Sequence, residues 1–206
     1  MAGKAAELLA DVSRETEARL QTYYKLLRRW NRKINLVAPS TVEDAWERHF
    51  LDSLQILDGA PEGWQTWVDL GSGGGFPGMV VAISVDQGQM ERRVTLIESD
   101  QRKATFLRTV ARETQTLVSI LSERIEAADP LAADVVSARA LAPLGKLLSL
   151  AEPHCHPEGT LLFHKGEKVQ SELSEARKSW QFKVTESPSL TDPTASILKI
   201  RELRRV

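Results

Sequence analysis

The sequence predicts an α/β fold: a doubly wound, mostly parallel sheet of seven strands, with a C-terminal antiparallel hairpin and an N-terminal helical extension. Three observations predict it. From residue 66 onward, short runs rich in Val, Ile and Leu alternate with helical stretches. A glycine-rich turn follows the first of these runs. The first 60 residues instead repeat apolar side chains at helical spacing, so we divide the chain into a helical extension, 1–60, and an α/β domain, 61–206.

The N-terminal extension is predicted to hold two helices. In "SRETEARLQTYYKLLRRWNRKINL" apolar residues recur every three or four positions, as on one face of a helix. Ser13 fits the N-cap, because Glu15 and Glu17 place acidic groups in the first turn. After a proline–serine break, Thr41 is expected to cap a second helix over 42–58.

The α/β domain is predicted from the alternation of its elements. Strands are expected at 66–70, 93–99, 117–121, 134–138 and 160–165. Helices are expected between them at 77–85, 100–114, 143–150 and 168–179. The last two apolar runs, "FKVTES" and "SILKIREL", are separated by "PSLTDPTA", which is too short for a crossover helix. These two strands should therefore pair antiparallel.

Composition limits the classes of function. The chain has 206 residues, 42% hydrophobic content and a formal charge of −1, so overall charge does not indicate a nucleic-acid partner. The single cysteine, Cys155, cannot form an internal disulfide, which is typical of a reducing cytosol. No run suggests a signal peptide or a membrane span. The "HCH" around Cys155 offers three ligands in one short loop, which is too little to predict a metal site.

The glycine-rich stretch "DLGSGGGFPG" is the most informative motif. Gly73, Gly75 and Gly78 formally match the dinucleotide pattern, but in a dinucleotide fold the first glycine directly follows the strand. Here that glycine is Gly71, and Asp69 lies two positions before it. An acidic residue there is typical of Rossmann-like S-adenosylmethionine-dependent methyltransferases, whose ligand carries an ammonium group; it would repel a pyrophosphate.

The end of the next strand gives a second indication. Glu98, in "VTLIESD", lies where a carboxylate accepts hydrogen bonds from the ribose hydroxyls of an adenosine, a role shared by NAD and S-adenosylmethionine. The alternative is that Asp69 forms a turn and Glu98 caps the helix that begins near Asp100. The occurrence of both carboxylates on consecutive strand ends favours the ligand interpretation. Pro77 suits the first position of the following helix.

The order of several motifs resembles one family. "WNRKINLVAPS", "RHFLDSL", "DLGSGGGFPG", "VTLIES", "SARALAPL" and "HKG" are similar to the ribosomal RNA small-subunit methyltransferase G family, also called glucose-inhibited division protein B. The resemblance implies a cytoplasmic class I methyltransferase that transfers a methyl group from S-adenosylmethionine to N7 of a guanine in 16S ribosomal RNA. It implies cofactor contacts at Gly71, Phe76, Ile125, Glu126 and Arg139. With the loop and strand-end residues, the expected cofactor site also includes Asp69, Gly73 and Glu98.

The predicted chemistry needs no general base, since guanine N7 carries a free lone pair. Alignment of the reacting atoms is then the main task of the protein. We expect Arg139 and Lys165, at successive strand ends, to be the catalytic residues that hold guanine O6 or a flanking phosphate. The alternative is that either cation pairs with a carboxylate such as Glu126 or Asp52.

Two features of the "RHFLDSL" motif have ordinary structural explanations. His49 falls on the apolar face of the predicted second helix with Trp46 and Phe50, so a buried histidine with satisfied nitrogens is the default. Arg48 and Asp52 lie one turn apart, which favours an ion pair on a solvated helix face.

A local run of cations predicts the RNA contact. "KLLRRWNRKINL" has no acidic residue, and we expect Arg28, Arg29, Arg32 and Lys33 to bind RNA phosphates. The expected partner is 16S ribosomal RNA, with a partly assembled small subunit as a candidate form of it, and the protein is expected to be a monomer. The alternatives are a methyltransferase of a small molecule or protein, a nicotinamide-dependent oxidoreductase, and a non-catalytic cofactor-binding factor.

Overall fold

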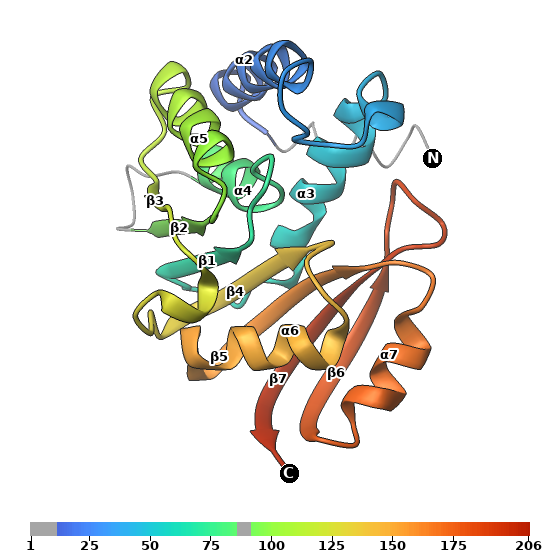
Figure 1. The fold of residues 1–206 in the computed structure, drawn as a ribbon. Helices are drawn as coiled ribbons and strands as arrows, with labels where there is room; N and C mark the ends of the chain where they lie inside the picture. The colour runs from blue at the N-terminus through green and yellow to red at the C-terminus, as the bar shows by residue number, and fades with distance from the viewer. Residues whose placement is uncertain (1–11, 86–91) are drawn as a thin grey trace.

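The computed structural model describes residues 12–85 and 92–206, and the seven predicted strands form a single sheet in the order β3-β2-β1-β4-β5-β7-β6 (Figure 1). Strands β1 to β5 run parallel, and β7 runs antiparallel to both β5 and β6. The predicted α/β class and the C-terminal hairpin are therefore confirmed. The strands are β1 (Thr66–Leu70), β2 (Arg93–Ile97), β3 (Ser119–Leu121), β4 (Ala133–Arg139), β5 (Cys155–Lys165), β6 (Trp180–Pro188) and β7 (Ser196–Arg205).

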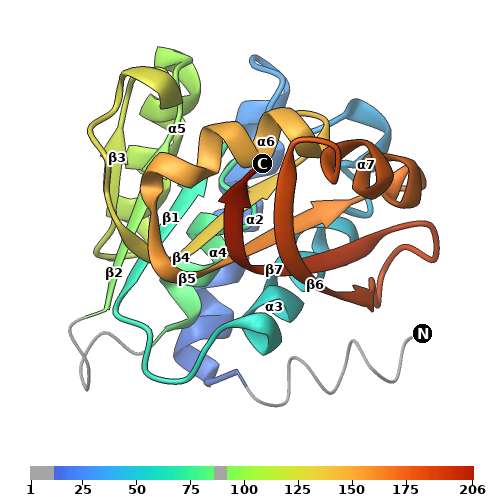
Figure 2. The same cartoon turned by 90° about the horizontal axis from the view of Figure 1, so that it is seen from below.

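Helices cover both faces of the sheet (Figures 1 and 2). One face carries α2, α4 and α5 together with α3, and the other carries α6 and α7. Their bounds are α2 (Arg14–Asn31), α3 (Asp52–Leu54), α4 (Gly78–Ser84), α5 (Gln101–Glu113), α6 (Leu144–Ala151) and α7 (Val169–Ala176). No helix within the described residues is long and apolar enough to span a membrane.

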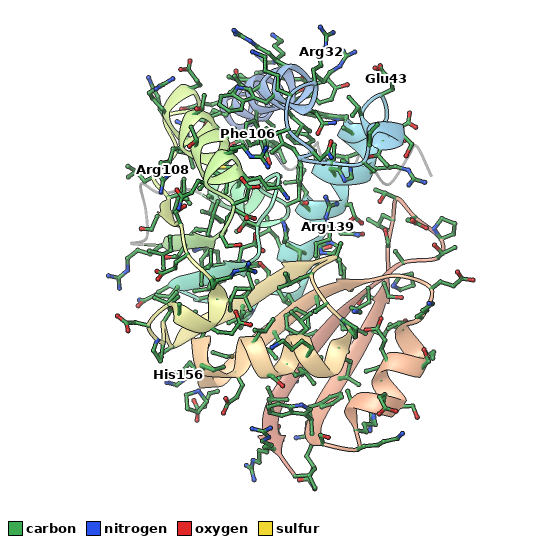
Figure 3. The ribbon with its side chains drawn as sticks, viewed as in Figure 1. Arg32, Glu43, Phe106, Arg108, Arg139 and His156 are labelled. Atoms are coloured by element: carbon green, nitrogen blue, oxygen red, sulfur yellow. The ribbon has the colours of Figure 1, made fainter. Side chains whose placement is uncertain are left out.

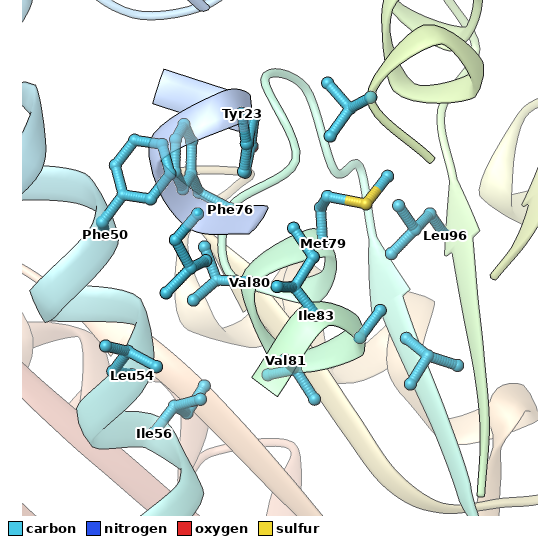
Figure 4. Close-up of a cluster of buried hydrophobic side chains, with 14 of the residues drawn as sticks. Tyr23, Phe50, Leu54, Ile56, Phe76, Met79, Val80, Val81, Ile83 and Leu96 are labelled. Atoms are coloured by element: carbon cyan, nitrogen blue, oxygen red, sulfur yellow. The ribbon is translucent and has the colours of Figure 1, made fainter. Parts of the chain in front are cut away.

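The N-terminal helix packs into the core of the α/β part. As predicted, Ser13 caps α2, its hydroxyl accepting a hydrogen bond from the Thr16 amide at 3.1 Å. Tyr23 of α2 is fully buried, with its ring centroid 4.8 Å from that of Phe50 and 5.4 Å from that of Phe76 (Figure 4). Burial of these rings against each other stabilises the junction. The proposed division at residue 60 therefore crosses a shared hydrophobic core, and it remains a prediction.

The second helix differs from the prediction. Thr41 does not cap it: the short 3₁₀ helix Pro39–Thr41 ends there, and the Thr41 hydroxyl donates to the Ala38 carbonyl at 2.9 Å. Helical structure begins with the π-helical stretch Trp46–Leu51, continues through α3 and ends with the 3₁₀ helix Gln55–Gly59. The expected start was wrong because the threonine side chain bonds backward along the chain, which competes with N-capping.

The helix after the glycine-rich turn also begins one residue later than expected. Its first residue is Gly78, and Pro77 occupies the N-cap position instead of the first helical position. Pro77 still has no amide hydrogen to leave unpaired at this helix end.

Candidate active site

A pocket of about 750 Å³ opens at the carboxyl ends of the central strands. This is the edge where parallel α/β sheets bind their ligands. Five of the predicted site residues line it: Gly71, Gly73, Phe76, Arg139 and Lys165. Its other walls include residues 36–41, the helical stretch that contains His49 and Asp52, Lys103 of α5, residues 164–168 with Glu172 of α7, and the connection between β6 and β7.

The glycine loop needs glycine for its backbone conformation. Gly71, Gly73 and Gly75 have φ angles of 62°, 56° and 96°, which other residues adopt at a cost. A Cβ on Gly75 would overlap the Tyr23 hydroxyl, whereas a Cβ on Gly73 would meet only the Gly71 carbonyl oxygen, at 3.8 Å. The loop is therefore packed on its inner side and open at Gly73 on the side of the pocket.

Glu98 connects the two strand ends of the predicted cofactor site. It is only 7% exposed, and its carboxylate accepts hydrogen bonds from the amides of Gly73 and Asp100, both at 2.7 Å. Asp100, and not Glu98, is the N-cap of α5, because the Asp100 side chain accepts from the amides of Arg102 and Lys103. Glu98 therefore fixes the glycine loop against β2, and it is not one of the residues that line the pocket.

Asp69 lies beneath the loop and does not line the pocket. Its side chain is fully buried under the start of α4 and accepts a hydrogen bond from the Ser137 hydroxyl at 2.7 Å. Burial raises the pKa of this carboxyl to about 6, against the lowering effect of the Ser137 hydrogen bond. A ligand in the pocket has no direct access to Asp69 in this conformation.

Arg139, the last residue of β4, is enclosed by the "RHFLDSL" segment. Its guanidinium donates to the Arg48 carbonyl oxygen at 3.1 Å, to Asp52 Oδ2 at 3.4 Å and to His49 Nδ1 at 2.8 Å. The guanidinium carbon also lies 4.9 Å from the centre of the Phe76 ring, within cation–π distance. The expected Arg48–Asp52 pair was wrong, since Asp52 is turned into the protein and pairs with Arg139.

Asp52 also holds one wall of the pocket. Its Oδ1 accepts hydrogen bonds from the hydroxyls of Ser189 at 2.9 Å and Thr191 at 3.2 Å, and from Gln55 Nε2 at 2.8 Å. Ser189 and Thr191 belong to the connection between β6 and β7. One buried carboxylate thus joins this connection, the helical segment and Arg139.

His49 lines the pocket, although the sequence suggested an ordinary core histidine. Both of its nitrogens are hydrogen bonded, as expected for a satisfied side chain: Nδ1 to Arg139 and Nε2 to the Thr41 hydroxyl, each at 2.8 Å. Burial, reinforced by the charge of Arg139, lowers the pKa of His49 to about 3, so the ring is neutral near pH 7.

Lys165, at the end of β5, contacts α7 and the loop that precedes α6. Its ammonium contacts Glu172 of α7 at 2.5 Å and donates to the Ala142 carbonyl oxygen at 3.0 Å, with 9% of the side chain exposed. Glu172 also accepts from the Leu144 amide at 2.7 Å. Both predicted catalytic cations therefore pair with carboxylates, as the alternative interpretation anticipated, and both also line the pocket.

The structure does not bring Ile125 and Glu126 into this pocket. They form part of the 3₁₀ helix Ile125–Ala127 after β3. In the sheet, β3 is an edge strand, separated from β4, which carries Arg139, by β2 and β1. Ile125 is 9% exposed and joins the core, while Glu126 is exposed and contacts Lys146 at 3.5 Å.

The predicted RNA-binding residues form an exposed group, here called the basic cluster: Arg28, Arg29, Arg32 and Lys33. Arg28 pairs with Glu43 at 3.2 Å, and the other three form no ion pair with any residue that the structure describes. Figure 3 shows Arg32 on the outer side of α2 and Arg139 at the inner end of β4. None of the four residues of the basic cluster lines the pocket, whose nearest lining residue in sequence is Leu36.

The cysteine region provides no metal centre within the described residues, which contain no group of three or more potential ligands. His154 is buried, with Nε2 bonded to the Ile125 carbonyl at 3.1 Å, and burial raises the pKa of the Cys155 thiol to about 12. Cys155 is therefore protonated and a poor nucleophile near pH 7.

Sequence reasoning named Asp52 as one possible carboxylate partner and treated His49 as a core residue by default, but it gave Thr41 and Glu172 no role at the site. The available signal was the unusual density of polar side chains in "RHFLDSL", a segment that was otherwise apolar and helical. The partner of His49 and Asp52 is 87 to 90 residues away in sequence, so spacing alone could not identify it.

Comparison with known proteins assigns the family. The family model described as rRNA small subunit methyltransferase G matches residues 16–198. The chain belongs to this family. A protein of that name from Ruegeria sp. is 48% identical over the full length of both chains. Another from Rhodospirillum centenum is 53% identical over 93% of this chain and 87% of the relative. The family resemblance in the sequence is confirmed.

Solved structures agree on the fold at low sequence identity. A SAM-dependent methyltransferase from Aquifex aeolicus has a TM-score of 0.60 at 14% identity, covering 80% of this chain and 98% of that one. M. jannaschii TYW2 in complex with AdoMet has a TM-score of 0.57 at 13% identity, covering 85% of this chain and 80% of that one. The predicted class I methyltransferase architecture is thereby confirmed.

Proposed function

We propose that this chain transfers a methyl group from S-adenosylmethionine to N7 of a guanine in 16S ribosomal RNA. Its relatives are named as small-subunit ribosomal RNA methyltransferases, and they match it over nearly the whole length of both chains. The observation that carries the proposal is the convergence of an open glycine loop, Arg139 and Lys165 on one pocket at the carboxyl edge of the sheet.

The residues at the first two strand ends suit the cofactor. Gly73 presents its main chain with no side chain close to it, and Gly71 and Phe76 line the same pocket, where Phe76 offers an aromatic wall. Each oxygen of Glu98 accepts one amide hydrogen bond, which leaves lone pairs for ribose hydroxyls. When bound, S-adenosylmethionine supplies an electrophilic methyl group on a sulfonium centre. Ile125 and Glu126 remain proposed contacts, and Asp69 is proposed to act indirectly, through the loop that it supports.

The pocket can position a guanine without proton transfer. N7 has a free lone pair, so the residues need only align the base and exclude water, which can lower the barrier by about 7–11 kcal/mol. Arg139 and Lys165 are the proposed donors to guanine O6 or a flanking phosphate. The reaction leaves positive charge on the base, and the paired carboxylates of Asp52 and Glu172 offset the two cations beside it.

The basic cluster is the proposed contact with the RNA backbone. Its exposed cations on α2 can meet phosphates outside the pocket. The proposed substrate includes the RNA of a partly assembled small subunit, since a chain of this size contacts only a limited part of the RNA fold. We further propose that the protein acts as a monomer in the cytoplasm.

The test is transfer of a labelled methyl group to purified 16S ribosomal RNA that lacks the modification. Labelled 7-methylguanosine after complete digestion is expected, and Arg139→Ala should give little. Large-subunit RNA and bulk protein are the controls. Label in another nucleoside, or only in protein or small molecules, would overturn the assignment. Binding of S-adenosylhomocysteine is measured in parallel, because its absence would instead exclude the cofactor.

A further inference from the structure

A continuous hydrogen-bond chain runs from the N-terminal segment to Arg139. The Thr41 hydroxyl donates to the Ala38 carbonyl oxygen at 2.9 Å, and it lies 2.8 Å from His49 Nε2. His49 Nδ1 lies 2.8 Å from a terminal nitrogen of Arg139. Ala38, Thr41, His49 and Arg139 all line the pocket.

The direction of this chain follows from the chemistry of its ends. A carbonyl oxygen only accepts, so the single hydroxyl proton of Thr41 is committed to Ala38. The hydroxyl oxygen must then accept a proton from His49 Nε2. A guanidinium only donates, so His49 Nδ1 must accept from Arg139. Both ends thus require the same neutral tautomer of His49, with its proton on Nε2.

The Ala38 end of this series of hydrogen bonds is held against α2. The side-chain oxygen of Asn31, the last residue of α2, accepts from the Leu36 and Val37 amides at 2.9 and 3.0 Å. This contact holds the segment that presents the Ala38 carbonyl. The His49 ring is also packed against Phe76, with ring centroids 5.2 Å apart.

The contacts of Arg139 with the described residues leave part of its guanidinium available. Three of its five N–H groups donate within the protein, to the Arg48 carbonyl, Asp52 and His49. Two donors therefore remain for a ligand in the pocket. Their direction depends on which bonds hold the other three.

We propose that His49, anchored through Thr41 to the Ala38 carbonyl, is a positioning residue that aims the two remaining donors of Arg139 at the substrate. The expected effect on kcat rests on the proposed function. The tautomer assigned to His49 does not, because it follows from the hydrogen bonds alone. His49 touches no reacting atom in this role; it acts through the arginine.

Two substitutions of His49 test the hydrogen bonds of its two ring nitrogens separately. In His49→Asn the amide oxygen can replace Nδ1 as acceptor for Arg139, whereas His49→Gln places its amide near Thr41 and removes that acceptor. We expect His49→Asn, which loses only the bond to Thr41, to lower kcat no more than a few-fold. His49→Gln should lower kcat about 10- to 100-fold with the KM for RNA little changed. Equal kcat in both variants, at matched unfolding temperature, would overturn the proposal.

Two substitutions of Thr41 provide a second test, with a smaller expected effect on kcat. Thr41→Val removes the hydroxyl at constant shape and should lower kcat several-fold, and Thr41→Ser should restore it. The loss from His49→Gln should also largely disappear in an Arg139→Ala background, because both changes act on one group. Additive losses would indicate an independent role for His49 and would contradict the proposal.

A readout independent of turnover distinguishes this inference from the proposed function. The ¹⁵N chemical shifts of the His49 ring should report a neutral ring protonated at Nε2 from pH 5 to pH 8. A charged ring, or a proton on Nδ1, would overturn the inference even if methylation of the RNA is observed. If the shifts agree but no RNA is methylated, the proposed function fails and the positioning geometry remains.

Discussion

Arg139 and the basic cluster contain the same kind of side chain in opposite surroundings. The Arg139 side chain is 16% exposed and bonded to Asp52, His49 and a carbonyl oxygen, whereas Arg28 in the basic cluster is 48% exposed and has one ion pair, with the exposed Glu43. Charges in water are screened and interact weakly, while charges in the protein interior depend on their partners. The position of a cation, more than its charge, therefore sets how much one substitution will change.

The largest effect should come from Arg139. We expect Arg139→Ala to lower turnover about 10²- to 10³-fold through loss of substrate donors. It should also destabilise the fold by about 3–5 kcal/mol, because Asp52 is left charged and buried. Single-turnover methyl transfer and denaturant unfolding measure the two effects.

The matched control removes both charges of that pair. Arg139→Met combined with Asp52→Asn should recover most of the stability and none of the turnover. If Arg139→Ala changes turnover no more than Arg29→Ala, the contrast between the two regions does not hold.

The next largest effect is expected from substitutions in the packing beneath the glycine loop. A Cβ at Gly78 would overlap the side chains of Asp69 and Leu96, so Gly78→Ala should destabilise the protein by about 1–3 kcal/mol. Gly145 of α6 has no atom within 4 Å of its Cβ position, and Gly145→Ala should instead stabilise by about 0.5–1 kcal/mol. Denaturation midpoints that move in the same direction would argue against tight packing under the loop.

The pH dependence of the free energy of unfolding should reveal that His49 is neutral in the folded protein. Its pKa is lowered to about 3 in the folded state, so between pH 6.5 and about 3 the unfolded chain binds a proton that the folded chain does not. Stability from this group is complete above pH 6.5 and declines as the pH falls. Between pH 8 and pH 5, wild type should lose about 2 kcal/mol more than His49→Asn. Parallel losses measured by urea unfolding would be inconsistent with a neutral His49.

The smallest effects are expected in the basic cluster. Arg29→Gln with Arg32→Gln should leave stability within about 0.5 kcal/mol of wild type. RNA affinity should fall, and the slope of log K against log salt should decrease by about 0.7–0.9 for each RNA phosphate that the variant no longer neutralises. Arg108→Gln with Arg177→Gln changes charge equally at other exposed positions and serves as the control. Equal reductions of affinity in both pairs would point to overall charge and not to a local contact.

The sequence predicted the elements better than the contacts between them. Alternating apolar runs identified all seven strands, and Ser13 correctly marked the start of α2. The prediction for Thr41 was wrong because a hydroxyl can bond either backward or forward along the chain, and spacing does not distinguish the two. Asp69 was expected at the pocket because of its position in the motif, yet it is fully buried, since the strand end turns its side chain under α4.

By itself, the sequence determined the α/β class, the glycine loop, the family and five of the residues that line the pocket, since local propensity and motif order carry this information. Only the tertiary structure decided the partners of the charges. Asp52 meets Arg139 across 87 residues and Ser189 across 137 residues. Such contacts depend on which strands and helices become neighbours in the folded sheet. That arrangement is set by the packing of the whole core and leaves no periodic trace in either segment.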